Sequence, residues 1–349
     1  MTVYCFTSAT YSYLGRARVL AKTVREHHPD WVFCLCLCDV PPQAFDPAMD
    51  REMFDEVVSV TELSIPDLPA WMFRHNIVEL STAVKGKMLC RLLEKPDADS
   101  VVYIDPDIAI FNPLMHVMDL LKNHPVVLTP HQTEPETHPQ GIVDNEIGSL
   151  KRGIYNLGFM AIANVPEGRR IAEWWRDRLL AYCRDDAENG LFTDQKWCDL
   201  IPALFENPAI LRNSGYNVAS WNLSHRPIRI DGHGQIFAAD APLRFFHFTK
   251  VDTAGEVMLE RYGSESIALF ELLRWYREAI RKQQPAEVPA RYWYYGTYED
   301  GTPIRRPERL IYRDRKDLQL AFPDPYRSGP ESFQSWCTIH RSELPRKGI

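Results

Sequence analysis

Two carboxylates separated by one proline are the residues of this sequence with the clearest chemical potential. Residues 101–104 are apolar and predict a buried parallel strand, and Asp105, Pro106 and Asp107 follow directly. Pro106 cannot donate a ladder hydrogen bond, so the strand should end here. In an extended segment the two carboxylates lie on one face, about 6–7 Å apart along the chain. Such a pair at the carboxyl end of a strand suits one hard divalent cation that also binds a diphosphate.

Two alternatives to a metal site stay open for this pair. Asp and Pro are common in polar turns at strand ends, which need no ligand. Phosphatases of the haloacid dehalogenase type also carry Asp-x-Asp after a strand, usually near the N-terminus and with Thr or Val two residues beyond the second Asp. Here Ala109 stands at that position, and a complete strand-helix-strand unit comes first. A metal-dependent phosphohydrolase is therefore the weaker enzyme hypothesis.

Composition narrows the class of protein. The 349 residues suffice for one large domain or two smaller ones, and 45% hydrophobic residues is an ordinary content for a globular protein. The net charge of −7 argues against a dedicated nucleic-acid binder. Residues 1–5 lack the features of a signal peptide, and no run of about 18 apolar residues predicts a transmembrane segment. We expect a cytoplasmic protein, with peripheral association at the inner face of the membrane as a further option.

Eight cysteines in a chain of this length do not indicate a disulfide framework. Cys34, Cys36 and Cys38 alternate with apolar residues in a predicted strand, which places the three thiols on one face. They lack the C-x-x-C spacing typical of zinc sites. We interpret them as buried structural thiols.

The first half of the chain alternates strand and helix patterns. This alternation indicates an α/β fold with a mostly parallel central sheet flanked by helices. Strands are predicted at residues 2–6, 31–38, 56–60, 101–104 and 125–128, and helices at residues 11–27 and 70–93.

The second half is less regular. Residues 129–149 are rich in Pro, Glu, His and Gln, and we expect a long loop at the rim of the site. Residues 154–163 are apolar, and residues 169–184 predict an amphipathic helix whose Trp174 and Trp175 pack in the core.

A break at residues 283–285 follows a predicted helix that ends near Arg281. We therefore divide the chain into a main domain, 1–282, and a C-terminal extension, 283–349, that packs on it. This extension is rich in Arg, Pro and aromatic residues. Binding of a glycan, a membrane surface or a partner is the alternative role for it.

Several motifs follow one another in a recognisable order. They are Lys-Gly-Lys-Met-Leu-Cys-Arg at 85–91, the acidic pair within 101–111, Tyr-Asn-Leu-Gly-Phe at 155–159, Phe-Thr-Asp-Gln-Lys-Trp at 192–197 and Phe-His-Phe at 246–248. The series resembles that of nucleotide-sugar-dependent glycosyltransferases with the GT-A fold, most like glycosyltransferase family eight and related bacterial polysaccharide enzymes. The resemblance covers about residues 1–280 and implies that residues 1–282 form a Rossmann-like GT-A catalytic domain.

The resemblance implies sugar transfer from a nucleotide-diphosphate donor, with UDP as the nucleotide, to a glycan or lipid-linked acceptor. A cation that bridges both phosphates stabilises the departing diphosphate. By resemblance the cation is Mn²⁺, with Mg²⁺ as the alternative, and its ligands are Asp105, Asp107 and His247. The alternative for His247 is a core histidine between Phe246 and Phe248 that hydrogen-bonds to the backbone. A non-catalytic sugar-nucleotide or glycan-binding module is the remaining alternative to an enzyme.

The resemblance also implies which residues contact the donor. Base, ribose, diphosphate and sugar contacts are expected from Thr7, Ala9, Thr10, Tyr11, Lys87, Tyr103, Ile104, Asp105, Asn156, Gly158 and Lys250. Tyr11 would stack on the base, and Gly158 would let the sugar ring approach. The alternatives are a helix cap by the residues of the turn at 7–11 and a solvated helix face for Lys87. Lys250 departs from the family pattern, because Phe248-Thr249-Lys250 replaces the usual Gly followed by Lys-Pro-Trp.

Asp194 and Gln195 resemble the Asp-Gln pair beside the reacting carbon in retaining members of the family. By this resemblance Asp194 binds sugar hydroxyls, and Gln195 lies beneath the anomeric carbon. An amide oxygen is a poor nucleophile, so Gln195 would stabilise oxocarbenium character, with front-face attack and retention. Asn217, Trp221 and Asn222 are candidates for the acceptor cleft, with burial in the core as the alternative for Trp221.

Overall fold

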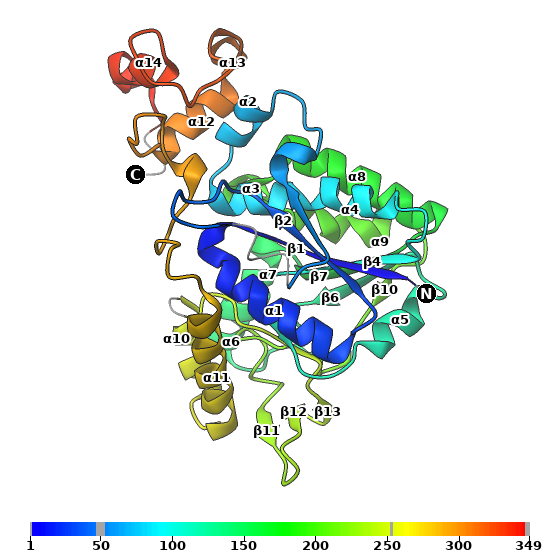
Figure 1. The fold of residues 1–349 in the computed structure, drawn as a ribbon. Helices are drawn as coiled ribbons and strands as arrows, with labels where there is room; N and C mark the ends of the chain where they lie inside the picture. The colour runs from blue at the N-terminus through cyan, green and yellow to red at the C-terminus, as the bar shows by residue number, and fades with distance from the viewer. Residues whose placement is uncertain (1, 47–52, 252–253, 346–349) are drawn as a thin grey trace.

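The computed structural model describes residues 2–46, 53–251 and 254–345. Its central sheet has seven strands in the order β10-β6-β7-β4-β1-β2-β3 (Figure 1). These strands are β1 (Val3–Ala9), β2 (Val32–Leu37), β3 (Glu56–Ser59), β4 (Ser100–Ile104), β6 (Val126–Pro130), β7 (Tyr155–Ala163) and β10 (Ala209–Ile210).

The sheet is mostly parallel, with one reversed strand. β1 is parallel to β2 and β4, β2 to β3, and β6 to β10. β7 alone among these strands is antiparallel to its neighbours β4 and β6. The α/β class with a mostly parallel central sheet, predicted from the sequence, is confirmed. Because β7 is reversed, its first residues lie beside the carboxyl end of β4, where Ile104 pairs with Phe159.

Helices cover both faces of the sheet, as Figure 1 shows. The helices α1 (Leu14–His27) and α5 (Met115–Leu121) pack on one face, and α4 (Lys85–Leu93) and α8 (Pro166–Tyr182) pack on the other. Trp175 is fully buried in the core on the second face, and the partly buried Trp174 packs against the same core, as predicted. Cys34, Cys36 and Cys38 share that face, and all eight cysteines are free and buried, which confirms the prediction of structural thiols.

A small two-stranded sheet lies next to the end of β4. It pairs β5 (Ile108–Ile110) with the distant strand β14 (Phe245–His247) in antiparallel fashion, with His247 opposite Ile108. The other small strands are β8 (Arg184–Asp186) with β9 (Leu191–Thr193), and β11 (Ile228–Ile230), β12 (Ile236–Ala238) and β13 (Ala241–Pro242).

The prediction that residues 70–93 are helical is largely confirmed, but the segment is divided. It forms α2 (Leu68–Phe73), α3 (Ile77–Ala83) and α4. The first helix ends at Phe73, and Asn76 caps the next one, because its side-chain oxygen accepts from the Glu79 backbone N–H at 2.9 Å. This capping box outweighs the apolar periodicity that runs across the break.

The prediction of a loop over residues 129–149 is only partly right. Its second half is helical, in α6 (Pro139–Gly141), the π-helical η4 (Ile142–Ile147) and α7 (Gly148–Arg152). Its apolar residues do not form a core stripe, because Asp144, Asn145, Gly148, Ser149 and Arg152 line a cavity. This helical half therefore lacks the apolar periodicity that indicates a helix in a sequence, and for this reason the sequence predicts a loop.

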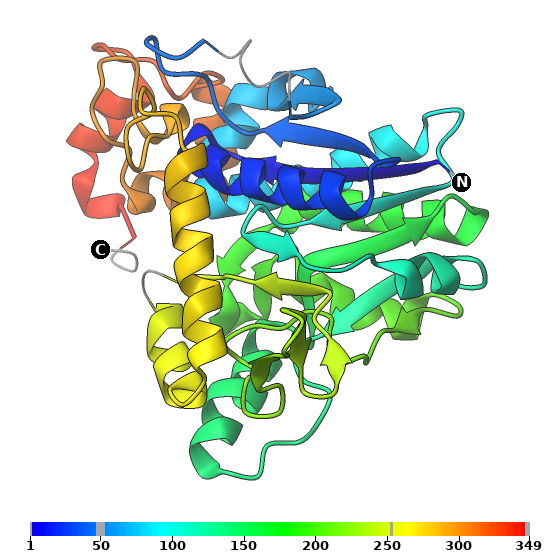
Figure 2. The same ribbon diagram turned by 60° about the horizontal axis from the view of Figure 1, so that its bottom comes forward.

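The chain ends in further helices. After α10 (Ala254–Gly263), α11 (Ile267–Gln283) lies against α1 (Figure 2). The C-terminal helices then gather beside α2 (Figure 1), where Phe73 packs with Tyr298, Tyr312 and Phe333. The division at residues 282 and 283 stays a prediction. The later elements are η7 (Tyr294–Gly296), α12 (Arg306–Asp314), α13 (Lys316–Ala321), α14 (Phe333–Ile339) and η8 (Arg341–Glu343), and the remaining short ones are η1 (Tyr11–Tyr13), η3 (Val60–Glu62), η5 (Ala187–Asn189), η6 (Lys196–Leu200) and α9 (Ile201–Leu204).

Within the described ranges, none of the helices has both the length and the apolar character needed to cross a bilayer.

Replacing Gly86 by alanine should destabilise the protein by about 1–3 kcal/mol, because the added methyl would lie 2.5 Å from the Arg176 Cα in α8. Gly148→Ala is the matched control, since a methyl there meets no atom closer than 3.8 Å. Alanine's helix propensity should make this control neutral or more stable, by up to about 1 kcal/mol. Urea denaturation measures both changes. Equal free energies of unfolding for the two variants would contradict tight packing of α4 on α8.

Candidate active site

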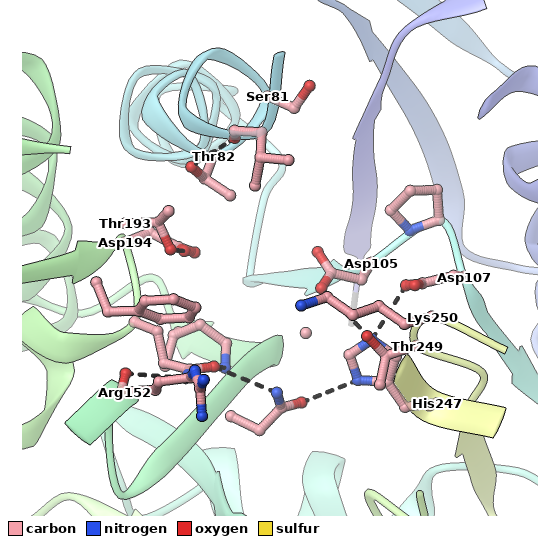
Figure 3. Close-up of a pocket in the computed structure, with 18 of the residues that line it drawn as sticks. Ser81, Thr82, Asp105, Asp107, Arg152, Thr193, Asp194, His247, Thr249 and Lys250 are labelled. Carbon is pink, nitrogen blue, oxygen red and sulfur yellow. Dashed lines mark hydrogen bonds and ion pairs between the residues drawn. The ribbon is translucent and has the colours of Figure 1, made fainter. Parts of the chain in front are cut away.

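A cavity of about 530 Å³ opens at the carboxyl ends of β1 and β4. This is the edge at which open α/β sheets bind ligands. The sequence-predicted residues that line it are Ala9, Thr10, Tyr103, Asp105, Asp107, Asn156, Gly158, Asp194, Gln195, His247 and Lys250. Figure 3 shows Asp105, Asp107 and His247 at one side of this cavity and Thr193 and Asp194 at the other.

The structure brings the three predicted metal ligands together. Three possible ligand atoms lie within 4.8 Å of one another, one each from Asp105, Asp107 and His247. His247 Nε2 is 3.0 Å from Asp107 Oδ1 and 3.7 Å from Asp105 Oδ2. The pairing of β14 with β5 produces this geometry, because it sets His247 opposite Ile108, next to Asp107. Two carboxylates and one imidazole form a donor set that fits a divalent metal ion.

Asn156 and Gly158 at the start of β7 fix the orientation of the imidazole. The Asn156 side-chain oxygen lies 3.1 Å from His247 Nδ1, which leaves Nε2 directed at the carboxylates. A methyl on Gly158 would lie 2.5 Å from His247 Cε1. Gly158 is therefore needed to admit the imidazole, a role the sequence prediction did not give it. A hydrogen bond at the outer ring nitrogen is typical of metal-binding histidines.

Charges in this group stabilise one another. Burial disfavours the charged form of His247, but the carboxylate of Asp107 outweighs it and raises the pKa of the imidazole above its usual value. Burial likewise opposes ionisation of Asp107, yet the imidazole lowers the pKa of its carboxyl group. The two groups thus favour each other's charged forms at the place where a cation would bind, and protonation of His247 would compete with that cation.

Lys85 connects the two sides of the cavity. Its amine donates to Asp105 Oδ1 at 3.1 Å, to Asp194 Oδ2 at 2.8 Å and to the Leu157 carbonyl at 3.1 Å. Its side chain is only 2% exposed. Burial lowers the pKa of the amine, but the two carboxylates raise it well above its ordinary value. Lys85 is therefore a buried cation that fixes the distance between the two acidic motifs.

The prediction that Lys87 contacts the donor is corrected by its position. Lys87 donates to the Ser64 carbonyl at 3.4 Å, outside the cavity. Residues two positions apart in an α-helix point about 200° away from each other, so Lys85 and Lys87 cannot face the same site. A sequence signal for Lys85 did exist, because Met88, Leu89 and Leu92 extend its face with the spacing of a buried stripe.

Asp194 and Gln195 follow β9 and face the cavity. Burial raises the pKa of Asp194, although Lys85 opposes that shift. The Gln195 side-chain oxygen accepts from the Leu157 N–H at 3.2 Å and from the Asn156 amide at 3.3 Å. Its amide nitrogen donates to the Arg152 carbonyl at 3.1 Å. Gln195, Asn156, His247 and Asp107 thus form one hydrogen-bonded series.

Three other predicted donor residues lie outside the cavity lining. Thr7 and Ile104 are buried in the sheet. Tyr11 is 2% exposed, and its ring packs edge-on against Phe45 with centroids 5.4 Å apart. Stacking of Tyr11 on a base is therefore wrong. The η1 turn directs Tyr13 to the cavity instead, where it is 41% exposed.

Of the residues predicted for the acceptor cleft, one lines the cavity and two do not. Trp221 lines the cavity, with its ring edge-on to His247 at 5.4 Å between centroids. Asn217 and Asn222 are buried, and their amides donate to the carbonyls of Pro130 and His131, each at 3.1 Å. Both asparagines support the chain behind the cavity.

No protein-family model matches the chain. Two relatives from Bacillus subtilis (strain 168), the uncharacterised proteins YfnF and YfnD, are similar to it. YfnF is 26% identical over 167 residues, which are 45% of this chain and 52% of YfnF. YfnD is 21% identical over 254 residues, 71% of this chain and 78% of YfnD. The chain thus spans about half the length of YfnF.

Solved glycosyltransferase structures are also similar. The galactosyltransferase LgtC in complex with donor and acceptor sugar analogues is 15% identical, with 82% of this chain and 97% of LgtC covered and a TM-score of 0.46. The apo form of glycosyltransferase GlyE from Streptococcus pneumoniae TIGR4 is 14% identical, with coverage of 80% and 64% and a TM-score of 0.44. Mouse xyloside xylosyltransferase 1 is 13% identical, with coverage of 72% and 98% and a TM-score of 0.43. These are distant likenesses.

Lys85→Met should destabilise the protein by about 3–5 kcal/mol, because it leaves the buried carboxylate of Asp194 and the partly exposed one of Asp105 without the cation that they share. Lys87→Met is the matched control, with an effect within about 0.5 kcal/mol. Chemical denaturation of both variants gives the comparison. A Lys85→Met protein as stable as the control would show that the buried amine is not what holds the two carboxylates.

Proposed function

We propose that the protein is a metal-dependent glycosyltransferase of the GT-A type that transfers a sugar from a nucleotide-diphosphate donor, with UDP as the nucleotide, to a glycan or lipid-linked acceptor. One observation supports this above all. The Asp105–Asp107–His247 group and the Asp194–Gln195 pair line the same cavity and are joined by Lys85. A donor needs both kinds of surface, one for its diphosphate and one for its sugar.

In this proposal Asp105, Asp107 and His247 hold Mn²⁺, or Mg²⁺, against the diphosphate. The bound cation supplies Lewis-acid stabilisation of the negative charge on the leaving group. Lys250 lines the cavity from the segment after β14 and adds a cation near the phosphates. Ala9 and Thr10, at the end of β1, leave room for the nucleoside, and Tyr13 offers an aromatic face to the base.

The sugar occupies the side formed by β7 and β9. Asp194 accepts hydrogen bonds from sugar hydroxyls, and Lys85 keeps its carboxylate charged and in place. The amide of Gln195 is held by three hydrogen bonds, so its oxygen presents a fixed dipole to the anomeric carbon. A fixed dipole stabilises developing positive charge without forming a covalent adduct. This arrangement favours front-face attack and retention of configuration.

Asp107→Asn should weaken Mn²⁺-dependent binding of UDP by about tenfold or more while the fold stays intact. One anionic ligand is lost, and a carboxylate at a strand end contributes little to the core. Calorimetric titration with UDP in Mn²⁺ and in EDTA measures the effect, with the exposed Asp119→Asn as control. Binding that is equal in Mn²⁺ and EDTA for the wild-type protein would reject the metal site.

A panel of GDP, ADP, TDP and CMP in the same assay tests the choice of nucleotide. Release of inorganic phosphate from simple phosphoesters would favour a phosphohydrolase instead. Nucleotide binding without turnover of any sugar donor would favour a binding module.

Gln195→Ala should lower kcat by about 100-fold or more and change donor affinity far less, because a fixed dipole beneath the anomeric carbon acts on the transition state. Steady-state kinetics with the sugar nucleotide that the wild-type protein consumes provide the test. The exposed Gln235→Ala serves as control. A loss of affinity at an unchanged rate per bound donor would make Gln195 a binding residue only. NMR of the first-formed product anomer tests retention independently.

A further inference from the structure

The C-terminal helix α12 contacts the cavity wall from behind. Two of its arginines reach the chain between α2 and α3. Arg309 donates to the Phe73 and His75 carbonyls at 3.1 and 2.9 Å. Arg313 donates to the Arg74 carbonyl at 2.8 Å. α12 thus supplies donors to consecutive backbone carbonyls at the end of α2.

Arg313 also forms a buried ion pair with Glu79 of α3. The two groups are 2.6 Å apart, and their side chains are 7% and 3% exposed. Burial raises the pKa of Glu79, but Arg313 more than offsets this, and the pKa lies below its usual value. Glu79 is therefore ionised at neutral pH, and each partner needs the other in this water-poor place.

Glu79 is a junction between two segments. One of its oxygens accepts from the Asn76 N–H at 2.8 Å, at the start of α3, and the other accepts from the Asp185 N–H at 2.9 Å, in β8. Helix α3 leads directly to Lys85 in α4, and β8 pairs with β9, which leads to Asp194. The two segments meet again at the 2.8 Å pair between Lys85 and Asp194.

A second contact from α12 reaches the same hairpin. Arg306 donates to the Asp185 carbonyl at 3.1 Å, so both backbone groups of Asp185 are engaged in this region. Two of the three predicted metal ligands are positioned by other elements, because Asp107 precedes β5 and His247 ends β14, which pairs with β5. Only Asp105 is linked to these contacts, through its 3.1 Å hydrogen bond from Lys85.

We propose that Arg313 is a positioning residue of the active site. Through Glu79 it holds α3 and β8 in register, and in this way the C-terminal segment sets the geometry of Lys85 and Asp194 on the sugar side of the cavity. The link between the segments is independent of the reaction, whereas its effect on turnover rests on the proposed glycosyltransferase function.

The test compares Arg313→Met and Arg313→Lys with Arg315→Met. Arg315 is the matched control, because it forms ion pairs with Asp317 and Glu343 just after α12 but contacts neither segment. In Arg313→Met, hydrogen exchange over residues 77–85 and 184–195 should accelerate about tenfold or more. The affinity for Mn²⁺ alone should change much less than the exchange rates, because Asp107 and His247 are held by β5 and β14 and only Asp105 contacts Lys85. Arg313→Lys keeps the charge but loses the fork geometry, so its exchange rates should lie between those of the wild-type protein and Arg313→Met.

Turnover at saturating sugar nucleotide should fall about tenfold or more in Arg313→Met and be partly rescued in Arg313→Lys, with Arg315→Met unchanged. If Arg313→Met does not fold, the double variant Glu79→Gln/Arg313→Met removes both buried charges at once and takes its place. Wild-type exchange and turnover in a folded variant would overturn the proposal. If the wild-type protein turns over no sugar nucleotide, the proposed function fails, while the exchange measurement still decides whether Arg313 holds the two segments.

Discussion

The buried amine of Lys85 is the interaction on which the rest of the site depends. Three parts of the chain converge on it: the end of β4 with Asp105, the residue after β9 with Asp194, and the Leu157 carbonyl in β7. Two carboxylates this close would repel each other in a medium of low polarity, and an isolated amine would be equally costly to bury. Together they satisfy one another, so Lys85 favours the charged forms of both acidic residues at the wall of the cavity.

The single reversed strand of the sheet, β7, positions the residues around the predicted metal ligands, as Lys85 positions the two carboxylates. Because β7 runs against β4, its first residues reach the edge where β4 ends, and Asn156 and Gly158 meet His247 there. The imidazole itself arrives through the pairing of β14 with β5. An amide that holds the outer ring nitrogen and a glycine that leaves space for the ring produce one orientation. The histidine is thus fixed before any cation binds, which lowers the entropic cost of coordination.

The C-terminal segment belongs to the same network of constraints. Its arginines donate to backbone carbonyls at the end of α2 and pair with Glu79 at the start of α3. The walls of the cavity on the sugar side are short helices and a short hairpin, which have little stability of their own. A framework that packs behind them is therefore a physical requirement for a site that must hold a buried lysine and aspartate 2.8 Å apart.

The sequence by itself determined the features that depend on local pattern. Alternating apolar segments specify the parallel strands and their helices, and Asp105-Pro106-Asp107 marks the end of β4 because proline stops the ladder. Only the tertiary structure decided which of two lysines and which of two tyrosines face the cavity, since that choice depends on the rotational phase of α4 and η1. Lys85 and Tyr13 took the places expected for Lys87 and Tyr11. Contacts between distant segments, such as β14 with β5 and Arg313 with Glu79, leave no local trace, because they are set by how the packed elements meet.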